Sequence, residues 1–538
     1  MATRLKRIVL ALSVVAAMSL AANSFAAIKV LFNGVGSSAA FNAMALAAGA
    51  PSGGGGQVCG ANNWTETKGG LGHDNRESTI SDVSGNVWVI WNGTATGTGT
   101  TQVCAYLNID SVVGNRLYFA RWLNAGVNSG AGVLNPNGFT CTSPPAGNNL
   151  VPLLPLDVAL PTSVCNAIFG QVFNAGMSDI RPEDALWATT RALTAIPTPA
   201  KWCPTCGLGY GPGPVGQTIL STFSSKSAQV VDFAISGNDP ITGEPVPGWI
   251  TSNVGSQILL VLVNSTDTSS AGLGNAAFNN VDRFVLGKTY EGVLTRTRDL
   301  IPSTGLPAVP LTVLNREPLS GTFNTFEYCV PASFEQNSSQ ENNVNPANPG
   351  NNPLDLTAAD GAVRERVIGT GEMTSEVGSI TDSLGYAFFS FGNVSGITTT
   401  AKYLAVDGVD PLYASYTTGA LPTCTAPCPG EVTFPNIVDG SYPIWNILRV
   451  ISAAPVPTGI ANLVSAAQSQ VAQIPDFVPV NSLEVFRSHY TQSGVAPSNG
   501  HKARSKEAGG DVGGAVLTVQ ADLDNITDTG KELTSLKQ

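Results

Sequence analysis

The sequence carries little charge, and its few charged residues form no basic clusters. Only 12% of the 538 residues are Asp, Glu, Lys or Arg, and the formal net charge is −11. A chain of this kind is not expected to bind nucleic acid, because contact with the phosphate backbone needs clustered Lys and Arg. The net charge does not exclude a small anionic ligand, because a buried site is governed by its local hydrogen-bond donors.

Long hydrophobic runs are also missing after residue 26, so we expect no membrane-spanning helix in the mature chain. The first 26 residues are typical of a secretory signal peptide. Arg4, Lys6 and Arg7 form a basic start, residues 8–22 are apolar, and Ser24-Phe25-Ala26 is a small-x-small cleavage site. We therefore predict cleavage after Ala26 and a periplasmic or secreted protein.

The residue patterns of common catalytic sites are absent. The three histidines are scattered in polar contexts, and neither an HExxH nor a Gly-x-Ser-x-Gly pattern occurs. The glycine run 53–56 lacks the Lys-Ser/Thr that a phosphate-binding P-loop needs. We predict no catalytic residue, no metal site and no cofactor, and we expect the protein not to be an enzyme.

Nine cysteines follow the predicted signal peptide, and export makes disulfides plausible. Spacing alone does not decide the pairing. Disulfide bonds could join Cys59 with Cys104 and Cys141 with Cys165 across longer loops. Cys203 with Cys206, and Cys424 with Cys428, could each close a small loop. We expect Cys329 to be left over and buried in a helix.

Strand and helix patterns alternate along the chain, which favours an α/β fold with mostly parallel strands. The 58 Gly and 35 Pro indicate many turns and long loops, including residues 51–85 and 334–353. The apolar run 258–263 is typical of a buried parallel strand. The other expected strands span 28–32, 87–90, 101–108 and 308–314, and the expected helices span 39–48, 182–194 and 458–474.

The most informative segment runs from Arg316 to Ser320-Gly321-Thr322. It supplies one planar cation, two hydroxyls and a glycine that lets backbone N–H groups approach a ligand. A helix that begins at Ser320 or just after would add the partial positive charge of its N-terminus. This donor set suits a buried tetrahedral oxyanion, although the same arginine could form an ordinary salt bridge on a surface loop.

Three further turns carry Ser or Asp ahead of an expected helix, and each could cap its helix or bind a ligand. They are Gly36-Ser37-Ser38, with Ser38 as the expected N-cap, Asp110-Ser111 and Ser178-Asp179.

These segments, in this order, resemble the binding segments of phosphate-binding proteins of ABC transporters, which belong to the type II periplasmic binding proteins. The downstream segments Gly385-Tyr386, 404–408 and 439–445 resemble the family's return to its first lobe. Two departures stand out. Ala39-Ala40 replace an aromatic residue of the first turn, and Asp110, which could repel an anion, stands in a turn that usually carries more Gly and Ser.

The resemblance implies a two-lobed periplasmic binding protein type II fold with mixed sheets and long loop insertions. It implies lobe 1 at 27–264 and 396–494, lobe 2 at 265–395, and a polar tail at 495–538. The implied ligand groups are Ser37, Ser38, Ser111, Ser178 and Asp179 from lobe 1 and Arg316, Ser320, Gly321 and Thr322 from lobe 2.

The function that the resemblance implies is binding of phosphate or a related oxyanion for ABC transport, by a monomer that hands its ligand to a permease. An alternative is an exported surface, adhesion or assembly protein that reuses the fold, which the extra length and the Gly/Asn-rich insertions motivate. A hydrolase of phosphate esters is a third reading, with an anion hole but no obvious nucleophile or metal set.

Overall fold

The computed structural model describes slightly less than half of the chain in discrete segments. They are residues 28–49, 58–59, 63–66, 87–92, 102–108, 110–120, 161–168, 173–180, 182, 249–301, 307, 309–316, 320–331, 340, 356–357, 361–367, 369–423, 432–471, 476–479 and 482–483. The predicted signal peptide, the C-terminal tail and the expected helix at 182–194, except Pro182, lie outside these segments.

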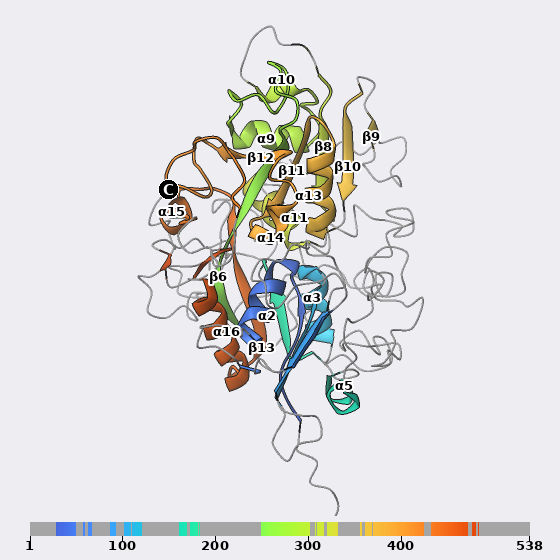
Figure 1. The fold of residues 1–538 in the computed structure, drawn as a ribbon, viewed down its shortest axis with the longest axis vertical. Coiled ribbons are helices and arrows are strands. Elements are labelled where there is room, and N and C mark those ends of the chain that lie inside the picture. Colours follow the sequence, from blue (N-terminus) through green and yellow to red (C-terminus); the bar gives the residue numbers. More distant parts are fainter. Residues whose placement is uncertain are drawn as a thin grey trace, which may run out of the picture.

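Two hydrophobic cores divide the described elements into two lobes (Figure 1). Lobe 1, the lower half of the view, contains β1 (Lys29–Gly36), η1 (Ser38–Ala40), α2 (Phe41–Gly49), β2 (Asn63–Glu66), β3 (Val87–Trp91), β4 (Gln102–Asn108), α3 (Ser111–Ala120), α5 (Thr162–Ile168), β5 (Ala175–Ser178), α16 (Thr458–Val471) and β14 (Val478–Pro479).

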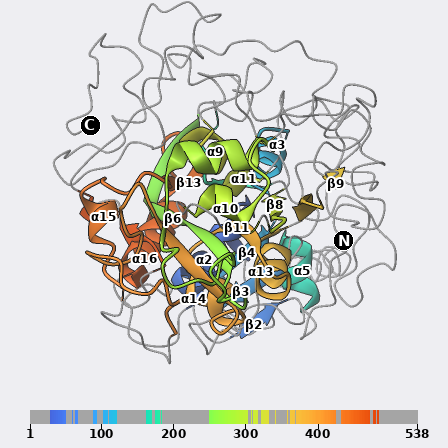
Figure 2. The same cartoon turned by 90° about the horizontal axis from the view of Figure 1, so that it is seen from above.

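Lobe 2 forms the upper half of the same view, and α9 and α10 cover its outer end (Figure 2). It contains β7 (Asn280–Val281), α9 (Arg283–Tyr290), α10 (Thr297–Leu300), β8 (Thr312–Arg316), α11 (Gly321–Cys329), β9 (Leu356–Thr357), β10 (Val363–Val367), α13 (Gly369–Ser379), β11 (Ser383–Phe388), α14 (Phe391–Ser395), β12 (Ala401–Val406) and α15 (Pro435–Val438).

Two long strands, β6 (Trp249–Asn264) and β13 (Trp445–Ala453), cross from one lobe to the other. On β13, Ile447 belongs to the lobe 2 core and Leu448 to the lobe 1 core. The two strands pair antiparallel, with Trp445 opposite Ile258. They therefore pass from one lobe to the other side by side and connect the two lobes.

The strands form one mixed sheet in the order β2-β3-β4-β1-β5-β13-β6-β11-β8-β10-β9, with β12, β7 and β14 off this path. Parallel pairs lie inside the lobes, where β1 joins β4 and β5, and β8 joins β10 and β11. The mixed α/β class is thus confirmed. The expectation of mostly parallel strands is wrong, because most pairs among the described strands are antiparallel, including those that β6 and β13 form.

The expectation of a parallel strand at 258–263 is wrong in direction. This run is buried, but it belongs to β6, which pairs antiparallel with β11, β12 and β13. Its apolar composition comes from burial in the lobe 2 core, and burial alone does not fix strand direction. Residues 401–444, which the sequence division placed in the return part of lobe 1, also contribute side chains to the lobe 2 core.

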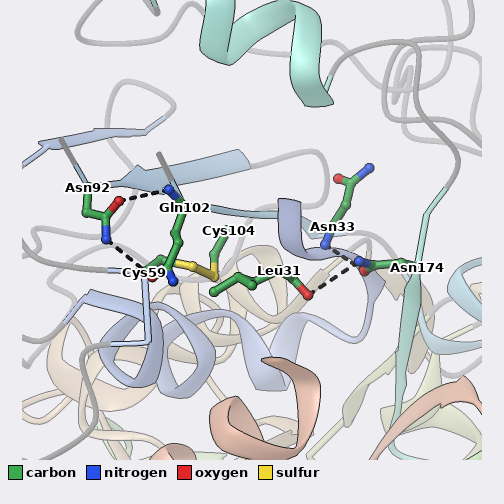
Figure 3. The surroundings of a disulfide bond; sticks show 7 residues. All are labelled: Leu31, Asn33, Cys59, Asn92, Gln102, Cys104 and Asn174. Carbon is green, nitrogen blue, oxygen red and sulfur yellow. Dashed lines mark hydrogen bonds between the residues drawn. A yellow bond between two sulfur atoms is a disulfide. The ribbon is translucent and has the colours of Figure 1, made fainter. Parts of the chain in front are cut away.

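The disulfide between Cys59 and Cys104 links the segment after α2 to β4, so this predicted pairing is confirmed (Figure 3). Close by, the backbone N–H of Gln102 donates to Asn92 Oδ1 at 2.8 Å, which ties β4 to the end of β3. Cys165 is disulfide-bonded as well, and its expected partner Cys141 lies outside the described residues. Cys329 is buried at the end of α11, as expected.

Among the described residues, no helix is both long enough and apolar enough to span a membrane.

Candidate functional site

The turn from β8 into α11 supplies the lobe 2 part of the site. Arg316 is the last residue of β8, and Ser320 is the N-cap of α11. The Ser320 hydroxyl oxygen accepts hydrogen bonds from the backbone N–H groups of Thr322, at 3.1 Å, and Phe323, at 3.5 Å. The helix therefore starts where the sequence placed it, and its first turn carries the backbone donors expected of a helix N-terminus.

Arg316 is completely buried. Its Nη1 donates to Thr370 Oγ1 at 3.1 Å and lies 3.4 Å from Thr322 Oγ1. Its backbone N–H donates to the Tyr386 hydroxyl at 3.3 Å. The guanidinium is thus held between the first turns of α11 and α13, and the reading of Arg316 as an ordinary surface arginine is wrong.

Thr370 and the Tyr386 hydroxyl are contacts that sequence reasoning did not assign to the site. Thr370 could have been found, because Gly369-Thr370 follows β10 and opens α13, which is again a strand, Gly/Thr turn and helix start. Tyr386 stacks on Phe326 with ring centroids 4.1 Å apart. Burial, and after it the neighbouring Tyr386, raises the pKa of Tyr290 well above its ordinary value, so this ring, whose centroid is 5.3 Å from that of Tyr386, stays uncharged.

The first turn of lobe 1 is built around Ser37. Its hydroxyl oxygen accepts the N–H of Ala39 at 3.2 Å and caps η1, so the prediction that Ser38 is the N-cap is wrong. A short 3₁₀ turn precedes α2, and this moves the cap back by one residue. The Ser37 hydroxyl also donates to Asp179 Oδ1. Ser38 is only partly buried and makes no side-chain hydrogen bond among those of the described residues.

Close backbone packing places the second and third turns of lobe 1 beside the first. A Cβ on Gly114 of α3 would lie 2.3 Å from the Cα of Gly36, so only glycine lets α3 approach the end of β1. The hydroxyl oxygen of Ser111, the first residue of α3, accepts the backbone N–H of Asp179 at 3.3 Å. Ser178 accepts from Asn115 Nδ2 at 3.0 Å, which holds α3 against β5.

The two lobes touch at Gly321. A Cβ there would lie 2.2 Å from Asp179 Oδ2 and 2.4 Å from Ser111 Oγ, so the backbone at the start of α11 lies directly against these two lobe 1 groups. Beside this contact, Arg316 Nη2 lies 4.0 Å from Asp110 Oδ1, and both side chains are buried. All the predicted site residues except Ser38 and Ser178 therefore lie in one chain of contacts across the lobe boundary.

Two amide side chains on the crossing strands connect to the same region, and sequence reasoning missed both. Gln257 of β6 donates from Nε2 to the carbonyl oxygen of Ala39 at 3.1 Å, and Asn446 of β13 donates from Nδ2 to Thr325 Oγ1 at 2.5 Å. The two residues face each other in the strand register. The hydrogen bond from Gln257 reaches the capped turn of lobe 1, and the hydrogen bond from Asn446 reaches α11 of lobe 2.

The arrangement offers an anion one buried guanidinium, several hydroxyls and the N-termini of α3, α11 and α13. Helix N-termini present backbone N–H donors and a partial positive charge. Asp110 and Asp179 bring two carboxylates to the same place. Within the described segments, no cluster of three or more His, Cys, Asp or Glu is placed to hold a metal ion.

No protein-family model and no curated protein matches the sequence. Solved structures with a similar chain course include the phosphate-binding protein PfluDING with bound phosphate, at 12% identity and a TM-score of 0.35, covering 83% of this chain and 90% of that chain. An ABC-type phosphate transport receptor from Vibrio cholerae matches at 17% identity and a TM-score of 0.26, covering 42% and 68%.

A phosphate-binding protein from Stenotrophomonas maltophilia matches at 12% identity and a TM-score of 0.26, with 57% of this chain and 76% of that chain covered. At such identities and TM-scores the likeness carries no weight for the ligand. The function therefore has to be argued from the residues of this chain.

Proposed function

We propose that this protein is a periplasmic or secreted solute-binding protein that holds phosphate, or a related tetrahedral oxyanion, between its two lobes. One observation carries the proposal: the fully buried guanidinium of Arg316 lies at the boundary between the lobes, beside the capped N-terminus of α11. Asp110 is the carboxylate at salt-bridge distance from this cation. Oxyanions are matched by planar guanidinium donors together with hydroxyl and backbone N–H donors, and this boundary brings all three together.

The donors come from both halves of the molecule, so bound ligand would favour the closed arrangement of the lobes. Arg316, Ser320, Gly321 and Thr322 contribute from lobe 2. Ser37 and Ser111 contribute donors from lobe 1, and Asp179 contributes an acceptor. Ser38 and Ser178, the other two predicted ligand groups, lie in the same lobe 1 turns. A ligand that contacts both sets binds the closed form better than the open form, and this difference drives closure about β6 and β13.

Asp179 gives the site a preference among oxyanions. An ionised carboxylate only accepts hydrogen bonds, so it matches a phosphate that keeps a proton and repels sulfate, which has none to give at neutral pH. One unmatched buried contact of this kind is worth about 1–3 kcal/mol or more of discrimination.

The decisive experiment is calorimetric titration of phosphate and of sulfate into purified protein stripped of bound anion. We expect phosphate to bind and sulfate to bind at least about tenfold more weakly. The Arg316→Ala variant should lose phosphate binding, because the anion would be buried without its cation. Arg298→Ala is the matched control, since Arg298 is an exposed arginine on α10. Unchanged affinity in Arg316→Ala would refute the proposed site.

The Asp179→Asn variant separates selectivity from binding. Asparagine can donate as well as accept, so the variant should narrow the ratio between phosphate and sulfate affinity. If the ratio between phosphate and sulfate affinity is unaltered, Asp179 does not determine the selectivity of the site.

Transfer of the ligand to an ABC permease in the inner membrane belongs to the same proposal, and cross-linking of the phosphate-bound protein to that permease tests it. An exported adhesion or assembly protein would show no phosphate-dependent contact with a permease.

A further inference from the structure

We propose that Asp110 is a specificity-determining residue that restricts the site to the singly charged, twice-protonated form of the oxyanion, which for phosphate is dihydrogen phosphate. The inference rests on the proposed function and concerns the same site. It starts from a residue that has no evident place in an anion site, because a carboxylate and an oxyanion repel each other.

Asp110 occupies one side of the guanidinium that a ligand needs. It immediately precedes α3, is 4% exposed, and its Oδ1 lies 4.0 Å from Arg316 Nη2. The other terminal nitrogen of the same guanidinium faces the hydroxyls of Thr322 and Thr370. An incoming anion that contacts Nη2 must therefore share it with the carboxylate of Asp110, and it meets that negative charge at close range.

A second carboxylate faces the same boundary. Asp179 Oδ1 accepts the hydroxyl of Ser37, and its Oδ2 points at the backbone of Gly321. Each ionised carboxylate can only accept a hydrogen bond, so a ligand oxygen that contacts either of them has to carry a proton. Dihydrogen phosphate has two O–H donors and one negative charge, monohydrogen phosphate has one donor and two charges, and sulfate has no donor and two charges. The form with two O–H groups is the one that satisfies both carboxylates.

Two other charged groups lie beside the first turn of α3 in the described part of the chain. Arg316 Nη2 is 4.0 Å from Asp110 Oδ1, and the backbone N–H of Asp179 donates to Ser111 Oγ. Arg449 on β13 is buried, lies opposite Ser178 in the strand register, and donates from Nη1 to the carbonyl oxygen of Ile447 at 2.9 Å, within its own strand. These groups stay the same when Asp110 alone is replaced, so a comparison of variants isolates the effect of its charge.

The test is a series of phosphate titrations by calorimetry between about pH 5.5 and about pH 8.5, a range in which phosphate changes from the dihydrogen to the monohydrogen form. The proteins are the full-length wild type, Asp110→Asn, Asp110→Ser and the control Asp282→Asn. Both replacements at 110 remove the charge, and serine and asparagine are good helix-capping residues, so α3 keeps its start. Asp282 is an exposed N-cap of α9, where asparagine caps equally well.

We expect the wild type and Asp282→Asn to bind phosphate about tenfold or more tightly at the acid end of this range than at the alkaline end. Both variants at 110 should bind at least about tenfold more tightly than the wild type at the alkaline end, because monohydrogen phosphate has the single O–H that Asp179 needs. Their affinity should then vary less than about threefold with pH.

Two results overturn the inference in different ways. If the wild type and both variants at 110 bind phosphate with the same affinity and the same pH profile, or if the variants bind more weakly, Asp110 has no such role while the proposed function stands. If none of the proteins binds phosphate at any pH, the proposed function is wrong, and the inference about Asp110, which rests on it, is wrong as well.

Discussion

The substitution Gly321→Ala tests whether the lobes close on each other where the structure brings them together. The added Cβ would belong to lobe 2 and would lie 2.2 Å from Asp179 Oδ2 and 2.4 Å from Ser111 Oγ, both in lobe 1. Ordinary contact begins near 3.4 Å, so the lobes must separate by about 1 Å or Asp179 must turn away from Ser37.

Overpacking of this size typically costs about 1–3 kcal/mol, which here falls on the closed form alone. The population of the closed form, and with it the affinity for an anion bound between the lobes, should fall by about 5- to 150-fold. Phosphate titration measures the affinity, and small-angle X-ray scattering in saturating phosphate measures whether the lobes still close.

Gly396→Ala is the matched control for this experiment. Gly396 follows α14 with a φ of −75°, and a Cβ there would meet nothing within 4 Å. The control should bind phosphate as the wild type does. If Gly321→Ala binds within about twofold of the control and scatters identically, the contact at Gly321 does not limit closure and the reasoning is refuted.

The remaining predictions concern stability. Burial, and after it the charges of two nearby glutamates, raises the pKa of Glu376 from 4.5 to about 7. The folded state therefore binds this proton more tightly than the unfolded state. The resulting contribution to the free energy of unfolding is fully present below pH 4.5 and is lost as the pH rises through about 7. Urea unfolding should therefore show Glu376→Gln more stable than the wild type by about 1–2 kcal/mol at pH about 8, after allowance for partial exposure, with little difference at pH about 4.5; equal stability at both pH values contradicts this. Replacing Cys59 and Cys104 by serine should lower the free energy of unfolding by about 4 kcal/mol, from a disulfide that spans 45 residues. Reductant should then destabilise the variant less than it destabilises the wild type, and a loss below about 1 kcal/mol would contradict this prediction. Tyr386→Phe removes the acceptor of the Arg316 N–H and should lower the free energy of unfolding by about 1–3 kcal/mol, measured in the same way; an unchanged midpoint would count against that hydrogen bond.

The part of the site that sequence reasoning predicted correctly is the part encoded locally. Ser320 caps α11 because a hydroxyl placed just before a helix reaches the N–H groups two and three residues ahead, and that geometry depends only on neighbouring residues. The start of α3 at Ser111 followed from a similar turn pattern. The order of strand, turn and helix start therefore indicated which segments meet at the lobe boundary.

The details that could not be predicted depend on residues far apart in the sequence. The turn at Gly369-Thr370 resembles the other turns of the site, but nothing near Arg316 indicates that Thr370, 54 positions later, accepts from its guanidinium, because that contact depends on the pairing of β10 with β8. The direction of β6 was also hidden, because an apolar run reads the same in parallel and antiparallel pairs. The cap at Ser37 rather than Ser38 depended on a single 3₁₀ turn, which two adjacent serines do not reveal.

The crossing strands tie the two sides of the candidate site together. Gln257 and Asn446 face each other in the register, and each uses its amide nitrogen to hold one side of the site: Ala39 in lobe 1 and Thr325 in lobe 2. Their side-chain oxygens are buried and make no hydrogen bond in the described structure. Buried amide oxygens without donors are costly, so the strands between the lobes are not stabilised to the full by the protein's own contacts. If the lobes rotate about β6 and β13 as proposed, these oxygens would gain access to water, which would offset part of the loss of the two hydrogen bonds. The free-energy difference between the open and closed forms would then be small, and a few hydrogen bonds from the proposed anion would be enough to favour the closed form.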